Sequence, residues 1–291
     1  MKTESYELKG RVVVMGASSG MGREVARQLL RKGWRVGVAA RRKEPLDELC
    51  SEFPQQAVAE QIDVTSEDAA GRLLTLVRKL GGMDVYVHSS GIGWQNVALD
   101  ADLELRTVMT NGLGFTRMID AAFRYFRGLN DEKLNEESSE NSVFPSNNLD
   151  NFSNNSKNDS SPRSSDSSSV KGGHIVAISS IAGTKGLGPA PSYSATKAFQ
   201  NTYLEALEQL STNLRLGISI TDIRPGFVDT ALIDGQNYPL KLKPQMVAQQ
   251  IVKAIEKKRH VSIVDWRYHC LVAGWRLLPR CLWRRVPLCR A

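Results

Sequence analysis

Residues 11–22 read Arg11-Val-Val-Val-Met-Gly-Ala-Ser-Ser-Gly-Met-Gly22, an apolar run that leads into a glycine-rich segment. The apolar run predicts a buried strand, and the helix formers from Glu24 to Arg31 predict a helix after it. The glycines allow a sharp turn and a close approach of main chain to phosphate, while the start of a helix favours an anion. This stretch predicts a pyrophosphate-binding turn, although a plain strand-to-helix connection has the same pattern.

The alternation of apolar runs and amphipathic helices continues along the chain. We expect further strands at residues 35–40, 57–62, 83–88, 174–179, 218–223 and 261–264. Runs that are apolar on both faces suit a parallel sheet with helices over both sides. The predicted fold class is therefore α/β, a Rossmann-type doubly wound sheet of seven mostly parallel strands.

The second expected strand is followed by Arg41 and Arg42, where a Rossmann site that prefers NAD carries an acid. Two guanidinium groups can hold a 2′-phosphate through charge-assisted hydrogen bonds, whereas an acid would repel it. We therefore expect NADP(H) to be favoured over NAD(H); the alternative is a pair of solvated surface arginines. Asp63, after the third strand, either accepts a hydrogen bond from the adenine amino group or caps the following turn.

Tyr193 and Lys197 lie four residues apart in a segment rich in helix formers, which places them on one helix face. A nearby ammonium lowers the pKa of a phenol, which starts near ~10, and so favours acid–base work near neutral pH. Ser180, on the loop after the fifth strand, can hydrogen-bond a substrate carbonyl or alkoxide oxygen. Each residue type is common alone, but their shared place at strand ends of a nucleotide-binding sheet predicts a reaction centre.

From about residue 9 to residue 264, with one interruption, the chain resembles the short-chain dehydrogenases/reductases (SDR family). The cofactor turn of that family, Thr-Gly-x-x-x-Gly-x-Gly, is similar to residues 15–22, with Met15 in place of the threonine. Its Asn-Asn-Ala-Gly segment corresponds to His88-Ser-Ser-Gly91, which keeps the glycine but not the asparagines. Its Pro-Gly segment, which passes the nicotinamide, is similar to residues 224–230.

The resemblance implies four catalytic residues, Asn111, Ser180, Tyr193 and Lys197. Tyr193 would give a proton to the substrate oxygen in reduction and remove it in oxidation. Ser180 would position that oxygen, with Ser179 as the less favoured alternative. Lys197 would also hold the nicotinamide ribose, and Asn111 would hold a water that links Lys197 to solvent. The implied activity is hydride transfer between nicotinamide and a carbonyl or secondary alcohol; the alternative is an NADP(H)-binding regulatory or scaffold protein with little turnover.

Residues expected around the cofactor come from the glycine turn, the strand ends and the catalytic helix. They are Gly16, Ser18, Ser19, Gly20, Met21, Gly22, Arg41, Arg42, Asp63, Val64, Ser90, Gly91, Tyr193, Lys197, Pro225, Gly226, Val228 and Thr230. The expected substrate pocket is apolar and suits a lipid-like, steroid-like or aromatic carbonyl compound. Its residues would be Ser180, Tyr193, Trp94, Leu187, Leu232 and Tyr238.

Length and composition agree with one catalytic domain. The 291 residues, 41% of them hydrophobic, can bury one α/β core, which we place at residues 1–265. Residues 129–171 are rich in Ser, Asn, Asp and Glu and predict a disordered insertion, either without function or with a regulatory or partner-binding role. The four cysteines lack Cys-x-x-Cys spacing and a companion histidine cluster, so we expect no metal. We also expect a cytoplasmic protein, since no apolar stretch resembles a signal peptide or a membrane span.

Residues 266–291 form a basic, amphipathic tail, which predicts a helix kinked or divided at Pro279. The helix would carry two stripes, with Arg276, Arg280 and Arg284 on one and Leu271, Trp275, Leu278 and Leu282 on the other. The pattern suits peripheral contact with an anionic membrane; the alternatives are a cap over the substrate cleft and a subunit contact. The net charge of +7 owes much to this tail, and without a recognisable DNA- or RNA-binding module we expect no nucleic acid. The resemblance implies a homodimer or homotetramer.

Overall fold

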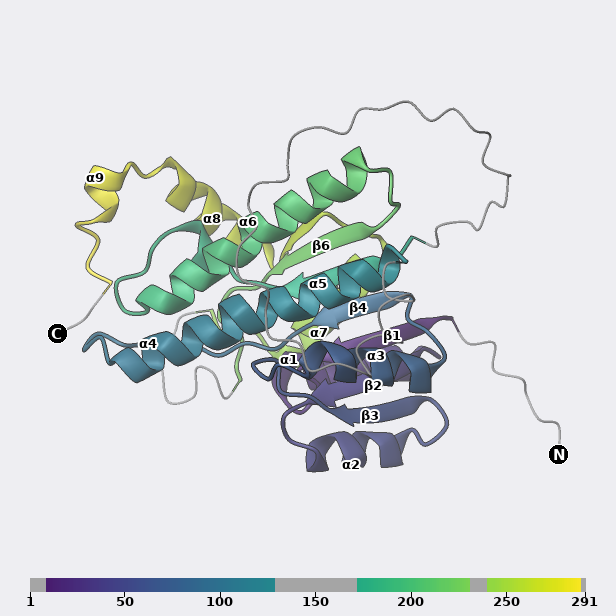
Figure 1. The fold of residues 1–291 in the computed structure, drawn as a ribbon. Helices are drawn as coiled ribbons and strands as arrows, with labels where there is room; N and C mark the ends of the chain where they lie inside the picture. The colour runs from purple at the N-terminus through teal and green to yellow at the C-terminus, as the bar shows by residue number, and fades with distance from the viewer. Residues whose placement is uncertain (1–8, 129–171, 231–239, 289–291) are drawn as a thin grey trace, which may run out of the picture.

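The computed structural model describes residues 9–128, 172–230 and 240–288. One sheet of seven parallel strands runs through them in the order β3-β2-β1-β4-β5-β6-β7 (Figure 1). The strands are β1 (Arg11–Met15), β2 (Arg35–Ala40), β3 (Ala57–Gln61), β4 (Val85–His88), β5 (His174–Ile178), β6 (Ser219–Arg224) and β7 (Val261–Ile263). The Rossmann-type fold class is thus confirmed, and each strand lies within two residues of its predicted limits. The expected insertion at 129–171 and the expected pocket residues Leu232 and Tyr238 lie outside the described residues.

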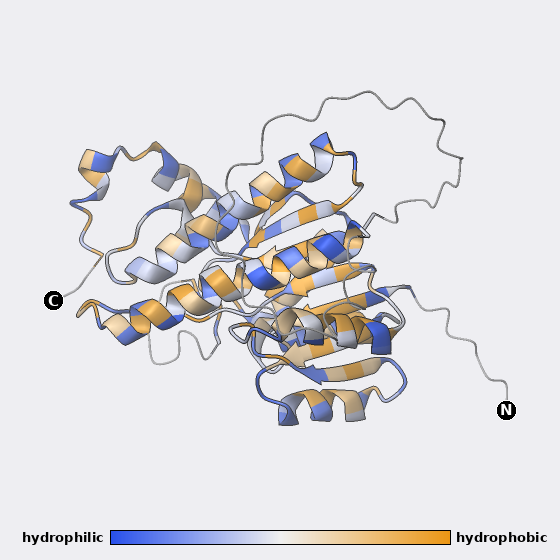
Figure 2. Ribbon diagram, in the orientation of Figure 1, coloured by the Kyte–Doolittle hydropathy of each residue, from blue (hydrophilic) through white to orange (hydrophobic). Residues whose placement is uncertain are grey.

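The sheet is buried on both faces, as the apolar runs predicted. In β1, Val12 and Val14 belong to one core cluster, and Val13 and Met15 belong to the other. Successive side chains of a strand point to opposite faces, so a strand that is apolar throughout supplies both cores. Figure 2 shows the central strands coloured mostly as hydrophobic, while the helices carry hydrophilic residues among hydrophobic ones.

Helices cover both faces of the sheet. Figure 1 shows α3, α5 and α6 on the near side and α1 and α7 behind it. The helical elements are α1 (Gly20–Arg31), α2 (Glu44–Glu52), α3 (Ala69–Leu80), α4 (Ala101–Val108), the π-helix η1 (Met109–Gly114), α5 (Phe115–Phe126), the 3-10 helix η2 (Ile181–Thr184), α6 (Pro191–Asn213), α7 (Pro244–Glu256), α8 (Trp266–Leu277) and α9 (Arg280–Trp283).

The strand order reverses between β1 and β4. From β1 the chain adds β2 and β3 on one side, and then crosses to place β4 on the other side of β1. The connections that leave the carboxyl ends of β1 and β4 therefore diverge and leave a crevice between them. In a doubly wound sheet this crevice is the place where ligands bind. The glycine turn after β1 lies at this point.

The tail folds against the core. Tyr268 and Val272 of α8 are buried in the same cluster as Val12 and Val14. The helix ends at Leu277, and α9 begins after Pro279, so the expected division at this proline is confirmed. The prediction of two stripes along one helix is wrong, because the chain between α8 and α9 is extended and breaks the helical period.

Candidate active site

The glycine turn leaves no room for side chains at Gly16 and Gly22. Gly16 and Gly20 adopt positive φ angles of 89° and 55°, which L side chains rarely adopt. A Cβ on Gly22 would lie 2.3 Å from the carbonyl oxygen of Gly16, and a Cβ on Gly16 would lie 2.7 Å from the backbone of Ser89 and Ser90. The turn is therefore packed closely against the end of β4. Since Ser19 makes no side-chain capping bond to α1, the first backbone N–H groups of this helix remain suited to an anion.

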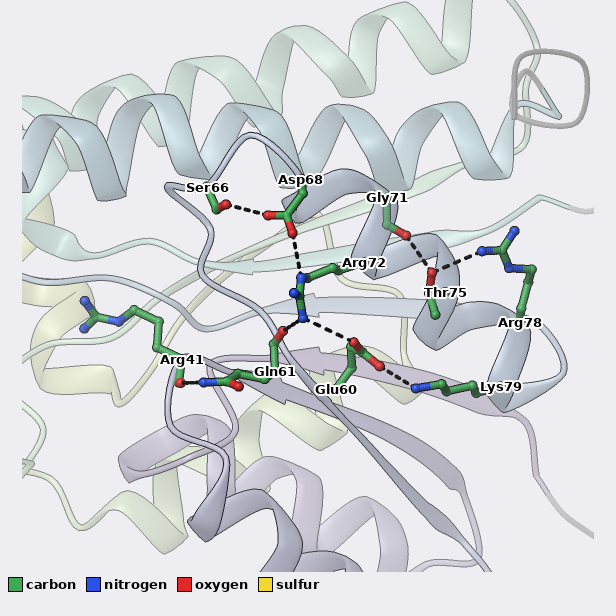
Figure 3. Close-up of polar contacts among 10 residues, drawn as sticks. All are labelled: Arg41, Glu60, Gln61, Ser66, Asp68, Gly71, Arg72, Thr75, Arg78 and Lys79. Carbon is green, nitrogen blue, oxygen red and sulfur yellow. Dashed lines mark hydrogen bonds and ion pairs between the residues drawn. The ribbon is translucent and has the colours of Figure 1, made fainter. Parts of the chain in front are cut away.

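Arg42 lies beside this turn. Its Nη2 donates a hydrogen bond of 3.3 Å to Ser18 Oγ, which brings a guanidinium from the end of β2 next to the glycines. Arg41 is held through its backbone, because its carbonyl oxygen accepts a 2.8 Å bond from Gln61 Nε2 (Figure 3). In that view the Arg41 side chain extends away from the other labelled residues. Both arginines are exposed, so a phosphate can reach them from solvent.

The end of β3 is fastened to α3 by an ionic network (Figure 3). Glu60 pairs with Lys79 at 2.6 Å and with Arg72 at 3.6 Å, and Arg72 also pairs with Asp68 at 2.7 Å. Arg72 Nη1 donates a 3.1 Å bond to the carbonyl oxygen of Gln61, the same residue that holds Arg41. Through Gln61, these contacts hold the segment after β2 that carries Arg41 and Arg42.

Asp63 acts as a turn cap. Its Oδ1 accepts hydrogen bonds of 2.9 Å from Thr65 N and 2.8 Å from Thr65 Oγ1. The expected capping role is therefore observed, and the expected adenine contact stays a prediction. Next to it, the carbonyl oxygen of Val64 accepts a 3.0 Å bond from Arg117 of α5. This bond links the chain that follows β3 to α5.

Ser180, Tyr193 and Lys197 line one cavity. Pro191 begins α6, so Tyr193 lies in its first turn and Lys197 follows one turn later. Lys197 Nζ lies 5.8 Å from the centroid of the Tyr193 ring, and Gly93 faces that ring so closely that a Cβ there would lie 2.3 Å from Tyr193 Cδ2. The structure thus brings the three residues together as the sequence predicted.

The two adjacent serines differ in their partners. Ser179 Oγ donates to Asp222 Oδ1 by a short hydrogen bond and to the carbonyl oxygen of Ile223 at 3.2 Å, so its hydroxyl is occupied by β6. Ser180 Oγ accepts a 3.0 Å bond from Ala182 N, which leaves its own O–H able to donate. Of the two serines, Ser180 is therefore the one whose hydroxyl can donate a hydrogen bond to a group in the cavity.

Lys197 is buried, and its ammonium group is held by two hydrogen-bond acceptors. Its Nζ donates to the carbonyl oxygen of Ile178 at 3.1 Å and to Gln200 Oε1 at 2.9 Å. Burial lowers the pKa of Lys197 from 10.5 to about 8, and the Asp222 carboxylate partly offsets this. The ammonium is therefore the main form at neutral pH, and it can favour the phenolate of Tyr193.

Asn111 lies in the π-helix between α4 and α5. Its Oδ1 accepts a 2.9 Å bond from Ile92 N, and its Nδ2 donates to the carbonyl oxygen of Ile92 at 2.7 Å. Its own backbone carbonyl oxygen accepts a 2.9 Å bond from Gln200 Nε2. The Asn111 side chain therefore fixes the loop after β4, and its backbone reaches Lys197 through Gln200. Sequence reasoning missed Gln200.

The cavity is lined by 12 of the 22 expected residues that the structure describes. From the expected set it is lined by Met21, Ser90, Gly91, Trp94, Ser180, Leu187, Tyr193, Lys197, Pro225, Gly226, Val228 and Thr230. The remaining expected residues, from the glycine turn, the β2 and β3 ends and the π-helix, lie outside its lining. They are Gly16, Ser18, Ser19, Gly20, Gly22, Arg41, Arg42, Asp63, Val64 and Asn111. Sequence reasoning missed Phe227 and Trp275, which also line the cavity.

The family-model comparison matches a short chain dehydrogenase over residues 10–141 and 166–239, which is more than half of the chain. The chain belongs to the short chain dehydrogenase family. An uncharacterized oxidoreductase of Myxococcus xanthus is 31% identical over 234 residues, which cover 78% of this chain and 76% of the relative. An uncharacterized oxidoreductase of Staphylococcus aureus is 27% identical over 257 residues, which cover 86% of this chain and 93% of the relative. The chain is thus placed among oxidoreductases.

Solved short-chain dehydrogenases share the fold. The enzyme of Burkholderia cenocepacia, in complex with NADP, superposes with a TM-score of 0.71 at 18% identity over 98% of this chain and 99% of its own. The enzyme of Sphingobium yanoikuyae, in complex with NADPH, gives a TM-score of 0.66 at 20% identity over 97% and 98% of the two chains. At these identities the likeness concerns the fold alone.

In this short chain dehydrogenase the tail reaches the site. Tyr268 of α8 accepts a 3.1 Å bond from Phe227 N and donates a 3.0 Å bond to the carbonyl oxygen of Leu240. Its ring lies directly against Gly226, where a Cβ would be 2.1 Å from Tyr268 Cζ. The tail therefore packs against the Pro-Gly segment that is expected beside the nicotinamide. Trp275 of the same helix lines the cavity.

His88 stands at the end of β4, where the SDR resemblance expects an asparagine. It is buried, its Nδ1 lies 3.0 Å from the hydroxyl of Tyr86, and its ring meets Phe115 edge-on at 5.2 Å. Burial, and then the charge of Lys197, lower the pKa of His88 from 6.5 to about 3. His88 is therefore neutral at physiological pH and packs as an uncharged ring.

Within residues 9–128, 172–230 and 240–288, no group of three or more His, Cys, Asp or Glu side chains could hold a metal ion. A search of the same residues finds no helix with the length and apolar character that crossing a membrane requires.

Proposed function

We propose that this protein is an NADP(H)-dependent oxidoreductase that reduces apolar ketones or aldehydes. One observation carries the proposal: Ser180, Tyr193 and Lys197 line the same cavity as Met21 of the glycine turn and residues 225–228 after β6. A carbonyl oxygen near Tyr193 would therefore lie beside the segment that the SDR resemblance assigns to the nicotinamide. The proposed cofactor-binding residues and the proposed catalytic residues therefore line the same cavity.

The residues present fit a dinucleotide phosphate. Gly16 and Gly22 approach each other closely and carry no side chains, so a pyrophosphate could lie against the main chain at these positions. Arg42, bonded to Ser18, stands where it could receive a 2′-phosphate. Similar folds have been solved with NADP and NADPH, which supports the same preference in this chain.

The proposed reduction divides the work among three side chains. When bound, NADPH supplies the hydride that is added to the carbonyl carbon. Tyr193 gives its hydroxyl proton to the carbonyl oxygen, and Ser180 donates a hydrogen bond that positions this oxygen. The Lys197 ammonium lowers the cost of leaving a phenolate on Tyr193. In oxidation of an alcohol, Tyr193 removes the proton instead.

The substrate side of the cavity is mainly apolar. Aromatic and aliphatic side chains line it, namely Trp94, Leu187, Phe227 and Trp275. Burial of a hydrophobic substrate against such a lining is favourable, whereas a sugar-like substrate would find few hydrogen-bond partners there. It supports a lipid-like, steroid-like or aromatic carbonyl compound.

The test is titration with NADPH and NADH by fluorescence, followed by a panel of ketones and aldehydes offered to the saturated protein. We expect tighter binding of NADPH, and turnover that Tyr193→Phe abolishes without loss of NADPH binding. Stoichiometric NADPH binding without turnover on the panel would support the alternative, a regulatory or scaffold protein. Failure to bind either nucleotide would overturn both.

We also propose self-association through the face formed by α4, η1 and α6. Leu105, Val108, Met109 and Leu113 follow one another at helical spacing and are exposed, and Phe199 of α6 is exposed as well. A contiguous apolar face of this kind marks an interaction site. We expect a homodimer or homotetramer in sedimentation velocity, and we expect Met109→Lys to shift it towards monomer.

The tail supports a third proposal, peripheral contact of a cytoplasmic protein with an anionic membrane. Trp266 and Leu277 are 73% and 85% exposed, and Leu282 is half exposed. Residues 266–291 contain six arginines and no acidic residue. Exposed apolar side chains among arginines suit an anionic bilayer surface. We expect cosedimentation with vesicles that contain phosphatidylserine, reduced by Leu277→Glu; equal recovery with and without phosphatidylserine would oppose the proposal.

A further inference from the structure

A buried glutamine joins Lys197 to the π-helix. Gln200 lies three residues after Lys197 on α6, and its side chain is 0% exposed. Its Oε1 accepts a 2.9 Å hydrogen bond from Lys197 Nζ, and its Nε2 donates a 2.9 Å bond to the backbone carbonyl oxygen of Asn111. One amide therefore connects the ammonium of the site to a different element of the fold.

The two partners allow only one orientation of this amide. An ammonium can only donate and a carbonyl oxygen can only accept, so the oxygen of Gln200 must face Lys197 and the nitrogen must face Asn111. A glutamate could accept from Lys197 but, when ionised, could not donate to Asn111. A leucine of similar size could do neither. The chemistry of the position is therefore specific for an amide.

Lys197 has few other groups that stabilise its charge. Its second hydrogen-bond acceptor is the carbonyl oxygen of Ile178, at 3.1 Å. Of the titratable groups that face it, Asp222 on β6 favours the ammonium, His88 on β4 is neutral because its pKa lies at about 3, and Tyr193 shares α6. Loss of the Gln200 oxygen would leave a buried ammonium with one neutral acceptor fewer, which disfavours the charged form.

We propose that Gln200 is a positioning residue that holds the Lys197 side chain in place and keeps it protonated beside Tyr193. The inference rests on the proposed function for its role in catalysis. The hydrogen bonds of Gln200, however, make a claim about Lys197 that can be measured in the protein without substrate. Gln200 also supplies the connection between Asn111 and Lys197 for which the SDR resemblance expects a water.

The direct test is the titration of Lys197 in the protein without nucleotide. Lysine labelled with 13C at Cε is followed by NMR over pH, and its signal is assigned by its loss in Lys197→Met. We expect Gln200→Leu to lower the pKa of Lys197, and Gln200→Glu to raise it by about 1–3 units, as an opposite charge does. A titration that is the same in both variants as in the wild type would overturn the proposal.

The pH profile of alcohol oxidation gives a second readout. The limb at high pH, where Lys197 loses its proton, should move to lower pH in Gln200→Leu and to higher pH in Gln200→Glu. General damage to the fold would lower activity in both variants without shifting the profile in opposite directions. Gln28→Leu is the matched control, because Gln28 bonds Glu24 and Gln245 on the surface between α1 and α7. We expect it to leave the Lys197 titration unchanged.

The two readouts separate this inference from the proposed function. Opposite shifts of the Lys197 titration without turnover on any carbonyl would confirm the contact while the proposed activity fails. Turnover with an unchanged Lys197 titration in both variants would support the proposed activity and overturn the role of Gln200. If Gln200→Leu does not fold, as judged by circular dichroism, Gln200→Glu and an additional Gln200→Met variant decide the result.

Discussion

The indole Nε1 of Trp283 donates a 2.8 Å hydrogen bond to the carbonyl oxygen of Gly186. In the other direction, Lys185 Nζ donates a 2.9 Å bond to the carbonyl oxygen of Leu278. The tail and the loop between η2 and α6 are thus joined at two points. Because the ring of Trp283 also meets that of Trp275 edge-on at 5.5 Å, these bonds hold the wall that the tail adds to the cavity. Trp275 of the tail therefore forms part of the cavity wall.

This arrangement predicts a change of specificity when Trp275 is shortened. In Trp275→Ala, large apolar substrates lose about 1–2 kcal/mol of contact, which corresponds to a roughly ten-fold lower kcat/KM. Small aldehydes that do not reach the indole should be affected less. The measurement is kcat/KM for a series of ketones and aldehydes of increasing size at saturating NADPH.

Trp266→Ala is the matched control, since Trp266 is on the same helix but exposed to solvent. It should leave the series unchanged. An equal loss for the smallest and the largest substrates in Trp275→Ala would contradict a role of Trp275 in the substrate wall.

The contact between Arg42 and Ser18 predicts which arginine sets the cofactor preference. Arg42→Ala would remove the charge-assisted hydrogen bond that we propose to the 2′-phosphate, worth about 1.5–3 kcal/mol, so the Kd for NADPH should rise at least roughly ten-fold. The Kd for NADH should change little, because NADH lacks that phosphate. Fluorescence titration with both nucleotides measures the two constants.

Arg78→Ala is a suitable control, since Arg78 bonds Thr75 on the surface of α3 (Figure 3). If Arg42→Ala weakened NADPH and NADH equally, the preference for NADP(H) would lose its structural basis.

The sequence could predict the parts of the site that follow from local pattern. The apolar runs located the strands, and the spacing of Tyr193 and Lys197 placed both on one helix face. The glycines of residues 16–22 marked a turn that is in fact closely packed. These features depend on neighbours along the chain, so a single sequence carries them.

Other parts depend on contacts between distant segments. A glutamine such as Gln200 on a helix ordinarily indicates a solvated face, and only the packing of α6 against the π-helix reveals that it is buried. Trp275 lies in a tail whose sequence suited a membrane surface, a cap or a subunit contact, and only the structure shows that Trp275 lines the cavity. The helical period in the tail could not show which side of α8 faces the core. Tyr268 and Val272 make that contact, and of the predicted apolar stripe only Trp275 packs against the same cluster among the described residues.

A substitution in the glycine turn tests whether this turn binds the cofactor, and the same substitution elsewhere serves as its control. In Gly22→Ala the new Cβ would lie 2.3 Å from the carbonyl oxygen of Gly16, so the turn must open. We expect the Kd for NADPH to rise at least roughly ten-fold, because the backbone N–H groups move away from the phosphate site. Isothermal titration calorimetry would measure this change.

Gly71→Ala makes the same chemical change at a site with open space. Gly71 lies in α3 and a Cβ there meets nothing within 4 Å. Alanine is favoured over glycine within a helix by about 1 kcal/mol, so this variant should unfold at slightly higher urea and bind NADPH normally. Comparable weakening of NADPH binding in both variants would argue against a specific need for glycine at residue 22.

Two buried histidines predict loss of stability in mild acid. Burial, assisted by Lys197, lowers the pKa of His88 to about 3, and burial, assisted by Lys258, lowers the pKa of His174 to about 4. The unfolded chain therefore binds more protons than the folded one between these values and about pH 6.5. The stabilising contribution is complete above pH 6.5 and is lost as the pH falls. Lys197, with a pKa of about 8, titrates above this range.

Replacement of one histidine should weaken this pH dependence. Between pH 7 and pH 5 each histidine accounts for a loss of about 2 kcal/mol in the free energy of unfolding. In His88→Asn the decrease should be smaller than in the wild type by about that amount, whatever the variant costs at neutral pH. Urea unfolding at the two pH values measures the difference. The same decrease in His88→Asn as in the wild type would show that burial of His88 does not control it.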